Sequence, residues 1–133
     1  MDPSTFLFKY RARINRVIDG DTVEATFDLG FKISITHKLR LIDIDAPEIR
    51  GKEKIKGQAA ASHLIKLICS HAANLVDGKL PDDSLAVIYI ATVKDSSGKY
   101  GRYRAELWGI DEEGEPVNIN QRMIDDGHAV EYG

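Results

Sequence analysis

The chain has 133 residues, of which 43% are hydrophobic and 29% charged, and its formal net charge is −3. These values are typical of a globular protein and exclude a disordered tail. A membrane protein is also excluded, because no segment approaches the roughly 20 apolar residues of a membrane span. One domain covering residues 1–133 is expected. Cys69 is the only cysteine, so no internal disulfide can form and the thiol is expected to pack as a small core residue.

The first ten residues contain the apolar run Phe6-Leu7-Phe8. They lack the basic segment, the long apolar stretch and the cleavage site of a signal peptide. As written, the chain is expected to be cytoplasmic, and it would be secreted if an upstream signal has been removed.

Alternating apolar residues predict three strands in the first part of the chain. The first covers residues 6–14, and a turn at Asp19-Gly20 separates it from a second strand over residues 23–27. A reversal at residues 28–30 then makes a hairpin with a third strand. The third strand is predicted to place five residues on one face: Phe31, Ile33, Ile35, Leu39 and Leu41. Its alternation ends at Leu41-Ile42, which predicts a bulge or an exit toward a turn at residues 45–47.

The apolar period changes to that of a helix over residues 58–69. Residues 70–84 are predicted to be a loop or an irregular insertion. Strands over 85–93 and 102–108 form a second hairpin, and a short helix follows, capped by Asn118 or Asn120 and ended by Gly127. This order predicts an α+β, mainly β fold. The expected architecture is a five-stranded OB-fold barrel with a helix between strands 3 and 4 and a short C-terminal helix.

Three short motifs together suggest one chemical site. They are Asp19-Gly20-Asp21-Thr22, the segment from Arg40 to Glu48 that contains Asp45-Ala46-Pro47, and Lys99-Tyr100-Gly101-Arg102. Carboxylate oxygens suit hard cations such as Ca²⁺ or Mg²⁺, and guanidinium groups match phosphate oxygens. A metal-assisted phosphodiester hydrolase is therefore the first interpretation. Each motif alone is also compatible with a solvated turn or a hairpin end.

The charge distribution is mixed for a protein that binds nucleic acid. The net charge is negative, whereas nucleic-acid binders usually have a basic excess. Residues 32–56, however, contain seven basic and four acidic side chains, and the acidic excess lies chiefly near the C-terminus. A weak and strongly salt-dependent grip on nucleic acid is expected.

The order of these motifs, together with Ile119-Asn120 and Asp126-Gly127-His128-Ala129, resembles the staphylococcal nuclease (thermonuclease) family. The resemblance implies that Asp21 and Asp45 bind Ca²⁺ directly and that the backbone carbonyl of Ala46 is a third ligand. Glu48 would contact the ion through water and act as general base. The resemblance assigns the remaining site residues to the substrate: Arg40 and Arg102 hold the scissile phosphate, and Lys99, Tyr100 and Tyr132 bind the nucleotide.

Tyr132 is implied as a base-stacking residue, although it lies one position early in the family register. Packing on the last helix is the alternative for this side chain. The four histidines lack zinc-ligand spacing.

The resemblance implies a calcium-dependent nuclease that cleaves single- or double-stranded DNA, and RNA as well, with low sequence specificity. A monomer that does not bind membranes is expected. The alternative is a catalytically inactive module of the same fold that binds nucleic acid or protein. Such a module is expected to have lost Arg40, Glu48 or Arg102, and all three are present.

Overall fold

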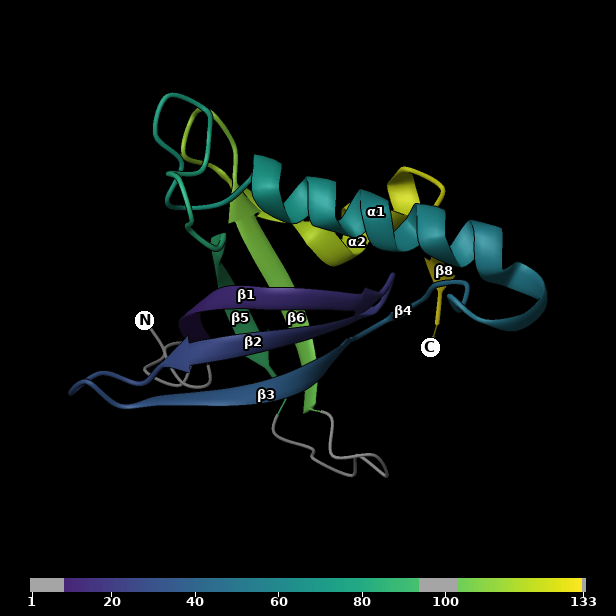
Figure 1. Cartoon of the computed structure of the whole chain (residues 1–133), viewed down its shortest axis with the longest axis horizontal. Helices are drawn as coiled ribbons and strands as arrows, with labels where there is room; N and C mark the ends of the chain where they lie inside the picture. The colour runs from purple at the N-terminus through teal and green to yellow at the C-terminus, as the bar shows by residue number, and fades with distance from the viewer. Residues whose placement is uncertain (1–8, 94–102, 133) are drawn as a thin grey trace, which may run out of the picture.

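The computed structural model describes residues 9–93 and 103–132 of the chain. Two hairpins and two helices account for most of it (Figure 1). A single cluster of buried apolar residues forms the core. The elements in chain order are β1 (Lys9–Asp19), β2 (Thr22–Asp28), β3 (Ser34–Leu41), β4 (Ile44–Asp45), the 3-10 helix η2 (Gly51–Glu53), α1 (Lys54–Ser70), β5 (Val87–Thr92), β6 (Tyr103–Ile110), β7 (Pro116–Asn118), α2 (Ile119–Asp125) and β8 (Val130–Glu131).

Five strands form a closed barrel, as the sequence predicts. β1 pairs antiparallel with both β2 and β5, β2 pairs with β3, and β5 pairs with β6. A parallel pairing of β3 with β6 closes the ring. The fold is therefore α+β and mainly β, with the helix α1 between the third and fourth barrel strands and α2 near the C-terminus.

Alternation along the strands sends one set of side chains into the barrel. Val23, Leu39, Ile88 and Leu107 are completely buried, and α1 contributes Leu64 to the same core. Cys69 lies half-buried at the edge of this core, as predicted, and burial raises the pKa of its thiol.

The prediction for the third strand is wrong in its first half. β3 begins at Ser34, and only Leu39 and Leu41 of the predicted face are buried. Phe31, Ile33 and Ile35 are exposed because the β2–β3 hairpin extends beyond the barrel, where no core remains to cover it (Figure 1).

Other boundaries shift by a few residues. β1 continues to Asp19 with irregular register after Ile14, and α1 begins at Lys54 rather than at residue 58. Residues 6–8 of the predicted first strand lie outside the described residues. Within 71–86 the structure has only turns and one isolated bridge, in agreement with the predicted loop.

The C-terminal helix is confirmed together with its cap. The side-chain oxygen of Asn118 accepts a 3.1 Å hydrogen bond from the N–H of Gln121, and the helix ends before Gly127, whose φ is +81°. A left-handed residue after a helix is readily supplied by glycine. In the described chain neither helix has the length and apolar character needed to cross a membrane.

Candidate functional site

Asp21 is the most confined carboxylate of the candidate site. It lies in the turn between β1 and β2, and its side chain is only 5% exposed. Its Oδ1 accepts a 3.0 Å hydrogen bond from the hydroxyl of Thr22, and its Oδ2 accepts one of 2.9 Å from the backbone N–H of Ala46. These contacts fix the carboxylate against a segment 25 residues away in sequence.

Arg40 connects the two predicted metal-binding carboxylates. Its Nη2 lies 3.4 Å from Oδ2 of Asp21 and 3.3 Å from Oδ1 of Asp45. Arg40 stands near the end of β3, opposite Thr22 in the β2–β3 register, so the strand pairing brings it beside the turn that carries Asp21. The Asp45 side chain is 51% exposed, which leaves it open to a ligand from solvent.

Two glycines, Gly20 and Gly57, allow the segments of the site to approach closely. A Cβ atom on Gly20 would lie 2.7 Å from Cβ of Ala60 and 2.8 Å from Cβ of Ala46. A Cβ atom on Gly57 would lie 2.0 Å from the backbone oxygen of Glu48. The helix α1 therefore holds both the Asp21 turn and the segment from Asp45 to Glu48 in place.

The site has an excess of negative charge when Asp21 is ionised. Burial, a hydrogen bond that the protonated Asp21 side chain donates to the Asp19 carboxylate, and the nearby Asp19 charge raise the pKa of Asp21 to about 6, while the Ala46 N–H and Arg40 act in the opposite direction. Desolvation and like charges both disfavour a carboxylate, so one guanidinium only partly neutralises this group. A bound cation would relieve the remaining cost.

Glu48 lies close by but is not fixed. Its residue is exposed, and within the described residues its carboxylate has no hydrogen bond or ion pair. Its backbone is held against Gly57, so the position of the segment is determined while the side chain keeps its freedom. A carboxylate of this kind is available to solvent or to a ligand.

Tyr132 is brought to the site by a strand pairing at the C-terminus. β8 pairs with β4, and the N–H of Tyr132 donates a 2.9 Å hydrogen bond to the backbone oxygen of Asp43. The Tyr132 ring centroid lies 5.8 Å from the guanidinium carbon of Arg40, within cation–π range. The structure therefore places Tyr132 at the site rather than against the last helix alone.

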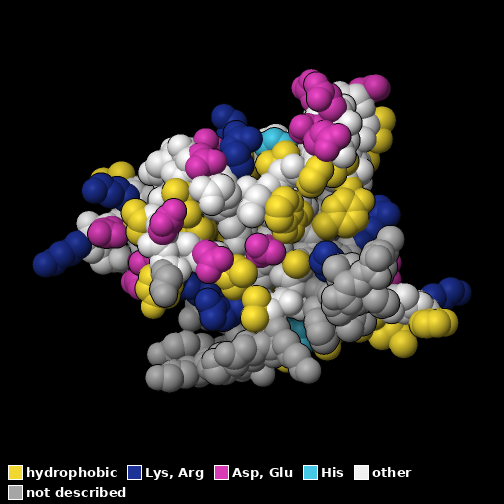
Figure 2. All heavy atoms as spheres, turned by 180° about the vertical axis from the view of Figure 1, so that it is seen from behind, with side chains coloured by type: hydrophobic (Ala, Val, Ile, Leu, Met, Phe, Trp, Pro, Cys, Tyr) yellow, Lys and Arg dark blue, Asp and Glu magenta, His cyan; other side chains and the backbone are white. Residues whose placement is uncertain are grey.

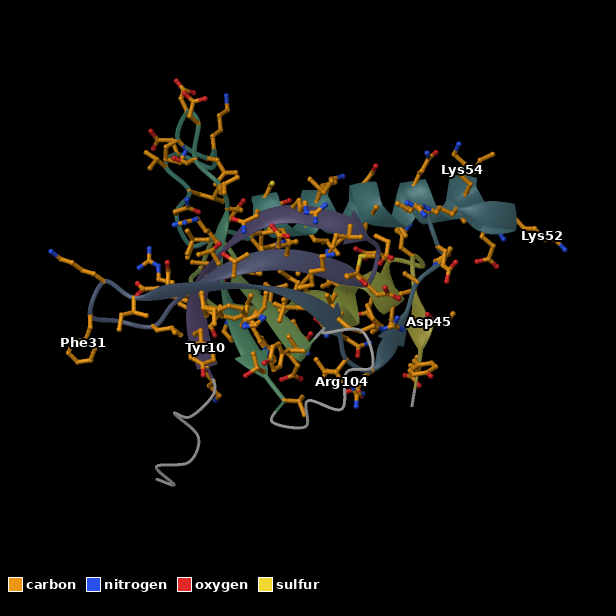
Figure 3. The ribbon with its side chains drawn as sticks, turned by 60° about the horizontal axis from the view of Figure 1, so that its bottom comes forward. Tyr10, Phe31, Asp45, Lys52, Lys54 and Arg104 are labelled. Atoms are coloured by element: carbon orange, nitrogen blue, oxygen red, sulfur yellow. The ribbon has the colours of Figure 1, made fainter. Side chains whose placement is uncertain are left out.

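The third predicted motif is outside the described residues: Lys99, Tyr100 and Arg102 all lie in 94–102. The structure adds Arg104, which is labelled in Figure 3. It is the partner of Arg40 in the parallel β3–β6 register. The signal for Arg104 in the sequence was its alternation with Ala105, which points the two side chains to opposite faces. Asp19 belongs to the first predicted motif, but its effect on the pKa of Asp21 depends on the folded turn.

The donor set fits a hard cation. Asp21 and Asp45 supply carboxylate oxygens, and Ca²⁺ and Mg²⁺ prefer oxygen ligands to sulfur or imidazole. In the part of the chain that the structure describes, no three His, Cys, Asp or Glu side chains form a metal-binding group by themselves. Backbone oxygens, water or substrate oxygens would have to complete the six to eight ligands of Ca²⁺. The Ala46 contact seen here uses its N–H, so the ligand role of its carbonyl stays a prediction.

No family model matches this chain, and a search of curated proteins gives no match either.

Proposed function

We propose that this chain is a calcium-dependent nuclease that hydrolyses phosphodiester bonds of DNA and RNA with low sequence specificity. The observation that carries the proposal is the position of Arg40, whose guanidinium lies within 3.4 Å of the buried Asp21 and the exposed Asp45. An oxygen-donor site for a cation thus adjoins a group suited to phosphate. The order of motifs that resembles the staphylococcal nuclease family supports the same proposal.

The residues of the site have distinct tasks in this proposal. Asp21 and Asp45 hold the cation, and Arg40 binds an oxygen of the scissile phosphate once the cation satisfies the carboxylates. When bound, Ca²⁺ neutralises charge on the phosphate and on its transition state. Glu48 orients the attacking water or accepts its proton. Arg102 is proposed as the second phosphate-binding arginine.

The geometry of Arg40 and Tyr132 is consistent with low sequence specificity. A guanidinium contacts phosphate oxygens, which are the same for every nucleotide. An exposed tyrosine stacks on any base, because every base has a π-face. Neither contact depends on the identity of the base.

The test is cleavage of a fluorescent single-stranded DNA and its RNA counterpart with Ca²⁺, with Mg²⁺ and with chelator. Arg40→Ala is expected to lower kcat by about 10³-fold or more, the scale of other phosphoryl-transfer arginines. Glu48→Gln is expected to lower it by about 10²- to 10⁴-fold. Asp77→Asn, in the loop after α1, is the control and should cleave like wild type.

Calcium binding is measured separately by calorimetry. Loss of binding in Asp45→Asn together with loss of cleavage would support the site as proposed. A folded wild-type protein that binds the strand but cleaves it with neither cation would overturn the enzyme proposal, and the non-catalytic binding module would replace it.

A further inference from the structure

The outer face of β1, β2 and β3 carries a row of cations that leads away from the candidate site. The paired residues across these strands include Arg13 with Thr26, Thr26 with Thr36, and Glu24 with both Arg16 and Lys38. Their sequence neighbours point inward, since Ala12, Ile14, Val23, Ala25 and Leu39 are buried. We call this surface the outer basic face; its cations are Lys9, Arg11, Arg13, Arg16, Lys38 and Arg40.

The cations of the outer basic face are mostly unneutralised. Within the described residues, Arg16 is paired with Glu24 at 3.3 Å and Arg40 with the site carboxylates, whereas Arg11, Arg13 and Lys38 form no ion pair. Glu24 and Asp28 are the acidic residues of β2. Although the net charge of the chain is −3, the outer basic face carries a concentration of positive charge.

Apart from Glu24 and Asp28 of β2, a group of acidic side chains lies away from this face. They crowd the corner formed by the loops 71–86 and 111–115 (Figure 2). A hollow of about 250 Å³ beside Tyr132 is lined by Asp43, Glu106 and Glu131. A polyanion leaving the site would be repelled on that side and attracted along the outer basic face.

The outer basic face ends at an unusual hairpin tip. Phe31 and Lys32 are the central residues of a turn closed by a 2.9 Å hydrogen bond from the N–H of Ile33 to the oxygen of Gly30. Their φ values are +54° and +64°, in a region where a bulky residue is strained. Phe31 is nevertheless 97% exposed, and it projects from the sheet end opposite to Asp45 (Figure 3).

Basic side chains lie near this tip. A hollow of about 300 Å³ is lined by Arg11, Arg13 and Lys32, and its other lining residues include one acidic side chain, Asp28. An exposed aromatic ring with cations next to it matches the way proteins hold nucleic acid, because bases stack on the ring while phosphates bind the cations. The strain at Phe31 is consistent with a functional rather than a structural reason for the residue.

We propose that the outer basic face binds an extended segment of nucleic acid that runs from Arg40 to the hairpin tip, where Phe31 stacks on a base. The six residue steps from Arg40 to Ser34 span about 20 Å. That length corresponds to about six nucleotide steps at the roughly 3.4 Å spacing along one strand. The proposal rests on the proposed nuclease function for the position of the cleaved bond, and it makes the substrate a polymer rather than a short oligonucleotide.

The first test is binding without cleavage, measured with chelator present. Fluorescence anisotropy with a labelled 24-residue DNA, single-stranded and duplex, is recorded between 50 and 300 mM salt. Arg13→Ala combined with Lys38→Ala is expected to weaken single-strand binding at least tenfold and to reduce the salt slope by about 1.4, because each lost phosphate contact of a single strand accounts for about 0.7. The matched control combines Lys66→Ala with Lys79→Ala, which removes the same charge from α1 and the loop after it.

The second test concerns the tip. Asparagine tolerates a positive φ better than phenylalanine, so Phe31→Asn should keep the fold intact. It is expected to weaken binding of the 24-residue single strand about fivefold or more. Cleavage of a four-nucleotide substrate, too short to reach the tip, should not change.

The outcomes separate this proposal from the proposed function. Two results would overturn the proposal that the outer basic face binds nucleic acid: equal losses of DNA affinity in the Arg13/Lys38 and control variants, or an unchanged DNA affinity of Phe31→Asn. Neither result would contradict the proposed nuclease function. If the variants lose DNA affinity as expected but the wild-type protein does not cleave, the binding role of the outer basic face is supported and the proposed nuclease function is overturned. Capture of wild type but not Phe31→Asn by phosphatidylserine vesicles, with DNA affinity unchanged, would assign the tip to a membrane surface instead.

Discussion

The backbone N–H of Ala46 donates a 2.9 Å hydrogen bond to Oδ2 of Asp21 and thereby ties together two predicted metal-binding segments. Burial and the neighbouring Asp19 raise the pKa of Asp21, whereas this hydrogen bond and the Arg40 charge lower it. These two contacts therefore favour the ionised carboxylate. The Asp21 carboxylate thus has partners within the protein, but its negative charge is only partly neutralised. The stability of the protein should therefore respond to the protonation of Asp21 and to cations.

Asp21→Asn is expected to stabilise the cation-free protein at pH 7.5. The pKa of Asp21 is raised from 3.8 to about 6, so the folded state binds the proton more tightly and wild-type stability falls as the pH rises between these values. Removing the charge should add about 1–3 kcal/mol to the free energy of unfolding above pH 6. The gain should shrink toward pH 4.

Urea unfolding from pH 4 to 8 with chelator measures this effect. Addition of Ca²⁺ should then raise the stability of wild type and leave Asp21→Asn unchanged. A variant that is less stable than wild type at pH 7.5 would contradict the assignment of a destabilising charge.

Gly57→Ala is expected to damage both the fold and the site. Alanine normally favours a helix by about 1 kcal/mol over glycine, but here its Cβ would fall 2.0 Å from the backbone oxygen of Glu48. Overpacking of this kind costs about 1–3 kcal/mol, and it should displace Glu48 and lower cleavage. Denaturation and kcat measured on the same sample provide the test.

Gly109→Ala is the matched control. Its Cβ would clash with the backbone oxygen of His71 at 2.6 Å, away from the predicted catalytic residues. A similar loss of stability with normal kcat is expected. If both variants lose activity equally, the link between Gly57 and Glu48 has no special role.

Asn120→Ala is expected to destabilise the protein by about 2–4 kcal/mol. The Asn120 side chain accepts a 3.0 Å hydrogen bond from the N–H of Leu107 and donates to the backbone oxygens of Ile42 and Ala105 at 3.1 Å. Its removal leaves buried backbone groups unpaired. Asn118→Ala, which removes only the helix cap, should cost about 1 kcal/mol. Chemical unfolding of both variants distinguishes the two roles, and equal costs would refute the difference.

Tyr132→Leu is expected to raise KM for single-stranded DNA several-fold while kcat changes little. The ring lies 5.8 Å from the guanidinium carbon of Arg40, where it both orients that group and offers a face to a base. Tyr132→Phe keeps the ring and should behave like wild type. Steady-state kinetics test this, and an equal effect of both substitutions would instead point to the hydroxyl group.

Asp126→Asn is expected to lower stability at pH 6 by less than about 1 kcal/mol, because solvent screens this surface pair. Oδ2 of Asp126 lies 2.7 Å from Nε2 of His63, which joins α1 to the end of α2, and this hydrogen bond lowers the pKa of Asp126. A lowered pKa means that the contribution is present above pH 3.8 and is lost as the pH falls through the folded-state value. The difference between wild type and variant should thus shrink as the pH falls below 3.8 in urea unfolding, and a constant difference would contradict this origin.

The sequence by itself determined the barrel and the two helices, and it singled out the carboxylates and Arg40 as candidate site residues. Alternation and helical period report burial directly, so Leu39 and Leu41 were assigned correctly to a buried face. The same logic failed at Phe31 and Ile33, because alternation shows which face a residue belongs to and not how far the core extends along the strand.

Only the tertiary structure decided which charges meet. The distance from Arg40 to Asp21, the register that sets Arg104 beside Arg40 and the pairing that brings Tyr132 to the site all depend on contacts between segments far apart in sequence. The concentration of cations on the outer basic face is of the same kind, since its residues come from three strands. Local patterns cannot encode such distances, because they follow from how the strands close the barrel.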